Sequence, residues 1–344
     1  LLATATDAAG NSHSATAVYS KDTTASTPVI STPIAGDNIA NRAEATNLVI
    51  QGAGAELNRP VTIEFSQGAH SYTLPGTIMA NASGGFTSPA VNLVSRGFGG
   101  DAGSAPITVS VTTSDAHGNS ATGTASFNVD TVVPGPVFLT SNSWGSDGIV
   151  NAAEQQSIEL AGEGAEPNTL VTISIDDTGA NASQTPAVTQ SVMSNAAGEF
   201  ELLAPASSLD LSSLNPGLIM LKITTTDAAG NSSLFSLDLT KDADAPVLTI
   251  DANAMGDNRV NALEQTAVII SGIASDGADG TGIVGGTVDI LFKHSNGAGI
   301  LVTGVPVAGA SYVSPPVDLS SLPDGNIAVT VTAVDDAGNS TTTQ

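Results

Sequence analysis

The sequence predicts an all-β chain of tandem antiparallel β-sandwiches, and three observations support this fold class. Acidic motifs return at intervals close to 110 residues, short segments between them alternate apolar and polar residues, and no long amphipathic helical pattern occurs. Glycine and proline are frequent, with 36 and 17 copies in 344 residues. That composition favours many short strands joined by tight turns.

The alternating segments indicate where the strands lie. Val61, Ile63 and Phe65 alternate with polar residues, which is the pattern of a half-buried strand with one polar face. Similar segments lie at residues 107–111, 171–175, 219–223, 288–292 and 327–331. Further strands are expected at residues 48–50, 158–160 and 268–270, each followed by a recurrent glycine at Gly52, Gly162 or Gly272. Repeats of about 110 residues with this pattern fit a seven-stranded sandwich.

The motif Asp-x-x-Gly-Asn-Ser occurs four times, beginning at Asp7, Asp115, Asp227 and Asp335. Successive copies are 108, 112 and 108 residues apart. Glycine supplies and asparagine tolerates the positive φ that a tight hairpin turn needs. The motif is therefore expected to join the last two strands, F and G, of each sandwich.

Two more acidic motifs keep the same register. An Asp-x-x-x-Asn-x-x-Glu element returns every 110 residues, as Asp37, Asn41 and Glu44, then Asp147, Asn151 and Glu154, then Asp257, Asn261 and Glu264. An aspartate shortly before a proline recurs as Asp22, Asp130 and Asp242, with Asp244 added in the last copy. Three interleaved motifs in one register predict a tandem array.

This register divides the chain into four parts. Residues 1–25 are expected to be strands F and G of a preceding repeat, and residues 26–132, 133–244 and 245–344 to be repeats 1, 2 and 3, the last ending within its final strand. With immunoglobulin-like strand order and repeats placed head to tail as a rod, three segments would meet at each joint. They are the A–B element of one repeat, the linker aspartate, and the Asp-x-x-Gly-Asn turn of the next repeat.

The charge balance narrows the choice of partners. The chain has 33 acidic and 8 basic residues, a formal net charge of −25, and no cysteine. Nucleic acid is disfavoured because phosphate contacts need Lys and Arg, and an anionic membrane is disfavoured for the same reason. No apolar stretch is long enough to insert into a membrane. Any metal must be held by oxygen ligands, since thiolates are absent.

Carboxylates crowded at a joint would repel one another, and a bound cation would remove that cost. Calcium accepts six to eight oxygen ligands at flexible angles, whereas magnesium demands stricter octahedral geometry. The predicted calcium ligands are Asp22, Asp115, Asp37, Asn41, Glu44, Asp130, Asp227, Asp147, Asn151, Glu154, Asp242, Asp244, Asp335, Asp257, Asn261 and Glu264. Two alternatives stay open. Asp-x-x-Gly-Asn is also a sound hairpin turn by itself, and the A–B element could be a helix cap with a solvated glutamate.

A few residues outside these motifs also need an interpretation. Repeat 3 carries an insertion at residues 275–286, where Asp276 and Asp279 could hold a second cation or belong to a plain loop. The histidines show no metal or catalytic spacing, and His117 is expected to face solvent. Trp144, the only tryptophan, is expected to be buried, because the core is poor in aromatic residues.

The landmarks resemble the bacterial immunoglobulin-like repeats of giant adhesins exported by type I secretion, including biofilm-associated and RTX adhesins. The residues that carry the resemblance are Gly36-Asp37, Asn41-Arg42-Ala43-Glu44, Gly198-Glu199-Phe200, Leu322-Pro323-Asp324-Gly325 and the Asp-Ala-Ala-Gly-Asn turns. The resemblance implies a secreted rod at the bacterial surface with calcium at its joints. Other parts of the parent protein would then contact a host or abiotic surface.

We therefore expect a monomeric spacer whose partners are calcium ions and the adjacent repeats of the same chain. A carbohydrate- or host-ligand-binding module is the alternative, and it would need exposed aromatic residues. One Trp and three Tyr, at Tyr19, Tyr72 and Tyr312, make a thin platform for it. No nucleophile elbow, phosphate loop or zinc-protease motif occurs, so the chain is not expected to be an enzyme.

Overall fold

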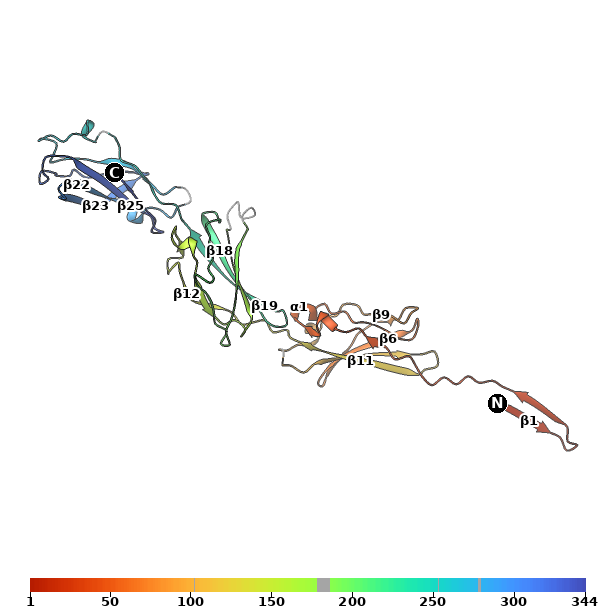
Figure 1. Cartoon of the computed structure of the whole chain (residues 1–344). Coiled ribbons are helices and arrows are strands. Elements are labelled where there is room, and N and C mark those ends of the chain that lie inside the picture. The colour runs from red at the N-terminus through yellow and green to blue at the C-terminus, as the bar shows by residue number, and fades with distance from the viewer. Residues whose placement is uncertain (102, 178–185, 253, 278–279) are drawn as a thin grey trace. The chain divides into compact units, whose positions relative to one another are not determined.

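The computed structural model describes residues 1–101, 103–177, 186–252, 254–277 and 280–344. The chain divides into two compact units, Leu1–Val133 with Asp227–Asn231, and Pro134–Thr226 with Ser232–Gln344. Among the described residues the only α-helix is α1 (Arg42–Ala45), a single turn. The all-β prediction is therefore confirmed (Figure 1). Within this described part, no helix has the length and hydropathy to cross a membrane.

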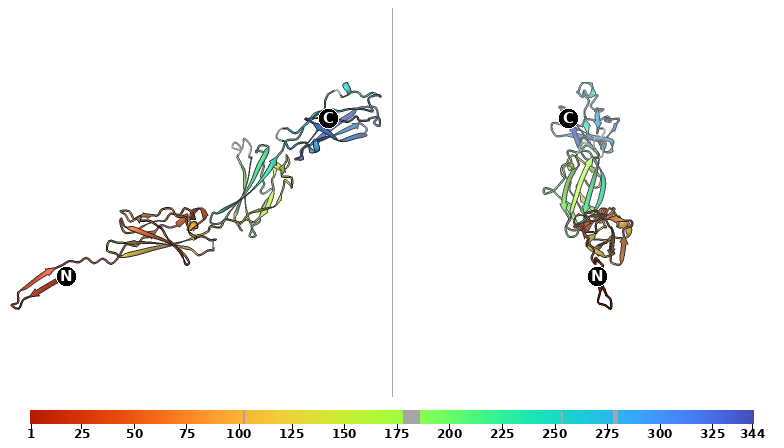
Figure 2. Two further views of the ribbon diagram at one scale, coloured as in Figure 1. Left: turned by 180° about the vertical axis from the view of Figure 1, so that it is seen from behind. Right: turned by 90° about the vertical axis from the view of Figure 1, so that its right-hand side faces the viewer.

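The first unit contains a hairpin and two sheets. The hairpin pairs β1 (Leu2–Thr6) with β2 (Ser12–Thr16). One sheet has the order β3 (Val29–Ile30), β5 (Gln51–Ala53), β9 (Phe86–Thr87). The other has the order β4 (Ile39–Ala40), β11 (Ser120–Val129), β10 (Ile107–Ser114), β6 (Pro60–Gln67), β7 (His70–Thr73), with β8 (Ile78–Met79) paired to β6. The long strands β10 and β11 pair antiparallel, and the left view of Figure 2 draws them in yellow tones.

The second unit begins with the same arrangement. One sheet has the order β12 (Phe138–Asn142), β14 (Leu160–Glu163), β17 (Phe200–Leu202). The other has the order β13 (Ile149–Val150), β19 (Ser232–Lys241), β18 (Gly217–Thr226), β15 (Leu170–Asp177), β16 (Val188–Met193). Pairings are antiparallel except for the two-residue parallel pairs β4–β11 and β13–β19. The prediction of antiparallel sandwiches did not include these pairs, which are too short to leave a sequence pattern.

The rest of the second unit is one seven-stranded sheet. Its order is β20 (Val247–Leu248), β21 (Ser271–Ser275), β24 (Ser311–Val313), β23 (Gly299–Ala308), β22 (Thr287–His294), β25 (Ile327–Val334), β26 (Ser340–Thr343). Strand β23 pairs with both β22 and β24, so it continues the hydrogen bonding between the two halves. The described residues also include short 3₁₀ turns at Ile34–Gly36, Val94–Arg96, Glu154–Gln156, Ala254–Gly256 and Val284–Gly286.

The period-two segments form strands with the expected faces. Burial alternates along β6, where Val61, Ile63 and Phe65 are buried and the residues between them are exposed. The strands expected at residues 48–50, 158–160 and 268–270 were placed too early, because β5, β14 and β21 begin up to three residues later. Leu48, Ile158 and Val268 make isolated bridges just before those strands. The prediction began the strands at these residues because they are apolar, and the structure shows that they are buried although they precede the strands.

Apolar side chains gather in three separate clusters. Phe65 and Phe98 belong to the first, Trp144 and Phe200 to the second, and Tyr312 to the third. Trp144 is only 2% exposed, so the prediction that it is buried is confirmed. The repeat boundaries at residues 26, 133 and 245 stay a prediction.

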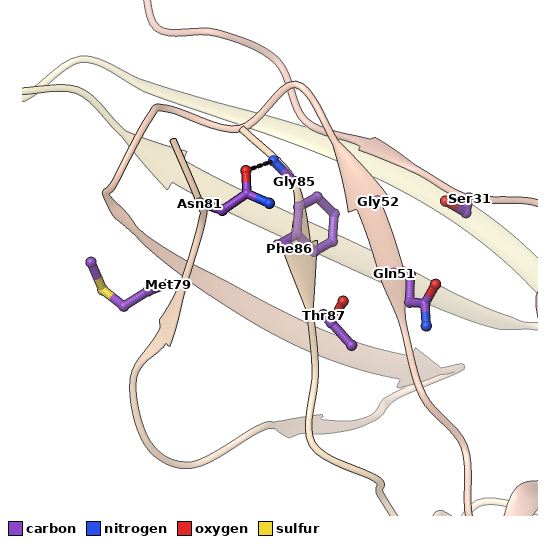
Figure 3. Close-up of a pocket in the computed structure, with 8 residues that line it drawn as sticks. All are labelled: Ser31, Gln51, Gly52, Met79, Asn81, Gly85, Phe86 and Thr87. Carbon is purple, nitrogen blue, oxygen red and sulfur yellow. Dashed lines mark hydrogen bonds between the residues drawn. The ribbon is translucent and has the colours of Figure 1, made fainter. Parts of the chain in front are cut away.

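Each recurrent glycine lies opposite an aromatic ring on the neighbouring strand. The cross-strand pairs are Gly52 with Phe86, Gly162 with Phe200, and Gly272 with Tyr312. A Cβ at Gly52 would clash with Phe86 Cζ and with Val29 O. Figure 3 shows Phe86 beside Gly52. The ring covers backbone that a glycine leaves bare, which explains why only glycine fits at this position.

Candidate metal centre

In every copy of the Asp-x-x-Gly-Asn turn, the aspartate carboxylate accepts from the backbone amide and the side-chain amide of the motif asparagine. In the first copy, Asp7 Oδ1 accepts from the amides of Ala9 and Asn11, both at 2.9 Å, and Asn11 Nδ2 donates to Asp7 Oδ2 at 2.9 Å. The motif glycine has a φ near +90° in all four copies: Gly10, Gly118, Gly230 and Gly338. The five residues therefore specify this turn by themselves, as the turn interpretation of the sequence proposed.

The Asp-x-x-x-Asn-x-x-Glu element is a capped helical turn. Asn41 Oδ1 accepts from Glu44 N at 3.0 Å, and Glu44 Oε2 accepts from Asn41 N at 3.1 Å, which is a capping box. Asn151 with Glu154, and Asn261 with Glu264, make the same reciprocal pair. The helix-cap alternative therefore describes the local geometry of all three copies.

The side chain of the first aspartate of this element accepts a hydrogen bond from a backbone amide of its own turn. Asp37 Oδ1 accepts from Ile39 N at 2.8 Å, and Asp147 and Asp257 bind the amide two residues ahead in the same way. All three aspartates are exposed. Their role as cation ligands stays a prediction.

Within the second unit, the turn at Asp335 packs against the capped turn at Asn151. Asn339 Oδ1 accepts from Ala152 N at 2.9 Å, and Asn151 Nδ2 donates to Ala337 O at 3.1 Å. Asn339 Nδ2 also donates to the carbonyl of Asp242 at 3.0 Å. The linker aspartate, the cap and the turn, which lie far apart in sequence, thus meet at one place.

Three carboxylates converge at this place, each on the first residue after a strand. Asp242 follows β19, Asp276 follows β21 and Asp335 follows β25. Each offers an oxygen, and these oxygens lie within 4.8 Å of one another. Asp335 is fully buried and Asp242 is 1% exposed. Such crowding of negative charge away from water is costly unless something compensates it.

The carboxylates are only partly satisfied by protein donors. Asp242 Oδ2 accepts from Thr281 N and Thr281 Oγ1, at 2.7 and 2.6 Å, and Asp276 Oδ2 accepts from Gly282 N at 2.6 Å. Asp276 Oδ1 is buried with no hydrogen-bond partner. Within the described ranges no Lys or Arg forms an ion pair with this cluster.

The electrostatic environment of Asp276 reflects this crowding. Burial is the largest cause that raises the pKa of the Asp276 carboxyl, and the charges of Asp242, Asp335 and Asp244 raise it further, against the lowering effect of the Gly282 amide. Lys241, next to Asp242 in sequence, donates instead to Leu214 O at 2.6 Å. An orphaned buried oxygen among three carboxylates fits a hard divalent cation, because such an ion prefers oxygen ligands.

The first unit holds a second, more exposed cluster. Oxygens of Asp22 and Asp115 and a ring nitrogen of His117 lie within 4.8 Å of one another. His117 Nδ1 is 3.2 Å from Asp22 Oδ2. The His117 side chain is 61% exposed, so it faces solvent as expected. Its position beside the predicted ligands Asp22 and Asp115 was not expected, because the histidines show no metal-ligand spacing in the sequence.

The first unit also repeats the contact between turn and cap. Asn231 Oδ1 accepts from Arg42 N at 2.7 Å, and Asn231 Nδ2 donates to Asp130 O at 3.1 Å and to Asp227 Oδ2 at 2.8 Å. Asp130 and Asp227 are therefore linked through Asn231.

The remaining predicted ligands are placed as follows. Asp244 is exposed and contributes its carbonyl to Asn339 Nδ2 at 3.4 Å. Asp257 and Asn261 are exposed, and Glu264 is partly exposed. Asp279 lies outside the described residues.

Sequence reasoning missed the motif asparagines at positions 119 and 339, which it treated as turn residues. The available signal was their fixed place in every copy of the motif. It also considered Asp276 only as an optional ligand in a loop, since a single insertion has no counterpart in the other repeats.

The aromatic residues give little support to a sugar-binding platform, since of the one Trp and three Tyr only Tyr19 is exposed. Trp144 and Tyr312 are buried, and Tyr72 is half-buried beneath the guanidinium of Arg96, which lies 4.7 Å from the ring centroid. The groove in Figure 3, about 380 Å³, is lined by polar and small residues, Met79 and the buried Phe86.

No protein-family model matches the chain, and no curated protein does so either. Solved structures do resemble it. One is a Ca²⁺-stabilised adhesin that helps an Antarctic bacterium bind ice, with 24% identity, 99% of this chain and 79% of that chain covered, and a TM-score of 0.43. Another comes from a 1.5-MDa bacterial ice-binding adhesin, with 22% identity, coverages of 93% and 96%, and a TM-score of 0.37.

A third is a tetra-tandem repeat from the extending region of a large adhesion protein, with 24% identity, coverages of 93% and 73%, and a TM-score of 0.30. All three are adhesin structures, the class of protein that the sequence motifs resemble. The TM-scores are low, so we argue the function from the residues themselves.

Proposed function

We propose that this chain is a calcium-stiffened spacer, made of tandem sandwich repeats, in a secreted bacterial cell-surface adhesin. The observation that carries the proposal is the buried cluster of Asp242, Asp276 and Asp335, with an oxygen of Asp276 that no protein donor satisfies. A calcium ion there would neutralise the three charges and use that oxygen. It would also tie the end of β19 to the ends of β21 and β25.

The role of the cluster follows from where its members lie along the chain. Asp242 ends one sandwich, whereas Asp276 and Asp335 belong to the next sheet. Without calcium the three carboxylates would repel one another and favour a bent joint, while each sandwich would keep its own apolar core. Extracellular modules bind calcium at roughly 10⁻⁴–10⁻³ M, so calcium outside a cell would stiffen the chain after export.

The other predicted ligands fit this role less directly. Asp22, Asp115 and His117 form a cluster in which Asp22 and His117 are exposed, so it would hold a cation more weakly. The expected partners are calcium ions and adjacent repeats, with contact to a host or abiotic surface made by other parts of the parent protein. A contribution to biofilm formation through adhesion, and export by type I secretion, belong to the same proposal.

The first test is a calcium titration by calorimetry on the whole chain and on Asp276→Asn. We expect the variant to lose one binding event or to bind about tenfold more weakly, because ligand charge sets calcium affinity. In chelator it should be at least as stable as the wild type, since a buried uncompensated charge is removed. Asp318→Asn is the matched control, because Asp318 is exposed and caps its own turn at Ser320.

The second test is small-angle scattering of the chain with calcium and with chelator. We expect a longer maximum dimension and a narrower distribution of conformations with calcium. An identical scattering profile in the two conditions, together with no calorimetric binding, would contradict the proposal.

A further inference from the structure

The asparagine of the Asp-x-x-Gly-Asn motif makes different contacts in its different copies. An asparagine side chain offers one acceptor oxygen and two donor hydrogens. Asn11 bonds through its side chain only to Asp7, in its own turn. Asn339 makes that local bond, to Asp335 Oδ2 at 2.9 Å, and adds Ala152 N and Asp242 O from the preceding sandwich.

The amide of Ala152 is a group that its own turn leaves unsatisfied. The first amides of a helical turn have no partner within the helix. Asn151 Oδ1 accepts from Ala153 N at 2.9 Å and from Glu154 N at 3.0 Å, but it does not serve Ala152. Asn339 supplies the missing acceptor from a residue 187 positions away, and it is only 8% exposed.

The same two-point contact appears in the first unit. Asn231 accepts from Arg42 N, which follows Asn41 as Ala152 follows Asn151, and donates to the carbonyl of Asp130, the linker aspartate. Asn119 keeps half of the arrangement, with Nδ2 donating to Asp22 O at 3.3 Å. The recurrence indicates a designed contact between the turn of one repeat and the cap and linker of another.

We propose that Asn339, with its counterpart Asn231, is a positioning residue that sets the register of the joint through neutral hydrogen bonds which persist without calcium. This inference rests on the proposed function, because it assigns alignment of a joint to the asparagine and stiffening of the joint to calcium. The asparagine aligns the capped turn with the linker, and the cation then stiffens a joint that is already aligned. Both amide functions of Asn339 are needed, since its oxygen meets the amide of Ala152 while its nitrogen meets three acceptors, Asp242 O, Asp244 O and Asp335 Oδ2.

The substitutions of Asn339 separate these functions. Asn339→Ala removes both contacts with the preceding sandwich. Asn339→Asp keeps an acceptor for Ala152 N but places a charged oxygen against Asp242 O and Asp335 Oδ2, where donors are needed. Asn11→Ala is the matched control, because Asn11 has the same local bond and no contact with another repeat.

The readout is amide hydrogen exchange at Ala152, measured in chelator, with ¹⁵N relaxation of the second unit as a measure of joint mobility. We expect slow exchange in the wild type and in Asn11→Ala, and exchange about tenfold faster in Asn339→Ala, in line with the loss of one buried hydrogen bond. Asn339→Asp should exchange at least as fast as Asn339→Ala. Dispersed amide signals from β25 and β26 would show that the sandwich still folds.

Unprotected Ala152 in the wild type, or equal protection in wild type and Asn339→Ala, would overturn the inference. If Asn339→Ala does not fold, Asn231→Ala provides the same test at Arg42 N. Calorimetry with calcium separates this result from the proposed function. A chain that binds no calcium but protects the Ala152 amide would refute the calcium spacer and support the positioning role. A chain that binds calcium but leaves the Ala152 amide unprotected would refute the positioning role and support the calcium spacer.

Discussion

The turns at Asp7 and Asp335 have the same motif, and in both the aspartate carboxylate accepts from the backbone amide and the side-chain amide of the motif asparagine. The two turns nevertheless lie in opposite environments. Asp7 and Asn11 are exposed on the hairpin β1–β2, whereas Asp335 is fully buried and Asn339 is 8% exposed. The exposed copy shows that five residues suffice to make the turn. The buried copy shows that contacts with surrounding segments, at Asp242, Asp276 and the cap at Asn151, turn the same motif into part of a joint between sandwiches. Local sequence thus encodes the turn, and the topology encodes the site.

The largest effect should come from removing the motif aspartate from the buried copy. Asp335→Ala leaves the amide of Asn339 without its acceptor in a buried place, so the third sandwich should lose about 2 kcal/mol of unfolding free energy. The measurement is made in millimolar calcium. Without calcium, the variant would also relieve repulsion among the three carboxylates, and this gain would offset part of the loss. Urea denaturation followed by amide exchange of β25 measures it.

Asp7→Ala is the counterpart in the exposed copy. Water can replace the lost acceptor there, so its effect on the hairpin should be much smaller. Equal losses in the two variants would show that burial of the turn contributes nothing.

Alkaline pH should destabilise the apolar cluster that contains Tyr312 and also Val331 and Ala333 of β25, the strand that leads into the buried turn. Burial, with a smaller effect from the charge of Asp251, raises the pKa of Tyr312 from 10.0 to about 12. The folded state therefore favours the protonated phenol, whose hydroxyl donates to Thr249 O at 2.9 Å. This stability is fully present below pH 10 and is lost as pH rises through about 12, with a total of up to about 2 kcal/mol.

Tyr312→Phe should abolish this alkaline dependence at a cost of about 1 kcal/mol at neutral pH. Phe86 and Phe200 occupy the equivalent place in the other two glycine–aromatic pairs, so a phenyl ring fits there. A pH series of denaturation curves measures both effects. A variant that keeps the alkaline loss would show that another group causes it.

Glycine substitution should affect both copies alike. Gly10 and Gly338 have φ values of 91° and 90°, and neither has an atom closer than 4.0 Å to a hypothetical Cβ. Alanine should therefore cost about 1 kcal/mol in each copy through backbone strain alone. A much larger loss at Gly338, seen as faster amide exchange of β26 than of β2, would mean that the joint has no room for a methyl group.

The smallest effect concerns the acidity of the exposed copy. The side-chain hydrogen bond from Asn11, followed by the backbone amides, lowers the pKa of Asp7 below its ordinary value of 3.8. The turn should then be stabilised above pH 3.8 and lose that support as pH falls through the lowered pKa of Asp7. NMR titration should show the Asp7 midpoint rising toward its ordinary value in Asn11→Ala, while an unchanged midpoint would remove the asparagine as its main cause.

These two turns also show what the sequence could predict. The turn itself was predictable, because Asp7 binds groups only two and four residues away, and the alternating strands were predictable because burial follows period two. The residues that surround Asp335 were not predictable, since Asp276 comes from an insertion with no counterpart in the other repeats. Asp37 and Asp147 were expected among the joint ligands from their recurrence and from the place of the A–B connection in the expected strand order. Recurrence is equally explained by the Asx turns they make with Ile39 and Ile149.

Trp144 gives the chain an intrinsic optical label. It is the only tryptophan, and it is 2% exposed in the cluster that contains Phe200. Selective excitation of tryptophan therefore reports on that core alone. A red shift of its emission during denaturation would mark the opening of one sandwich in a multi-repeat chain. Unfolding of a single repeat could thus be followed without attaching a dye.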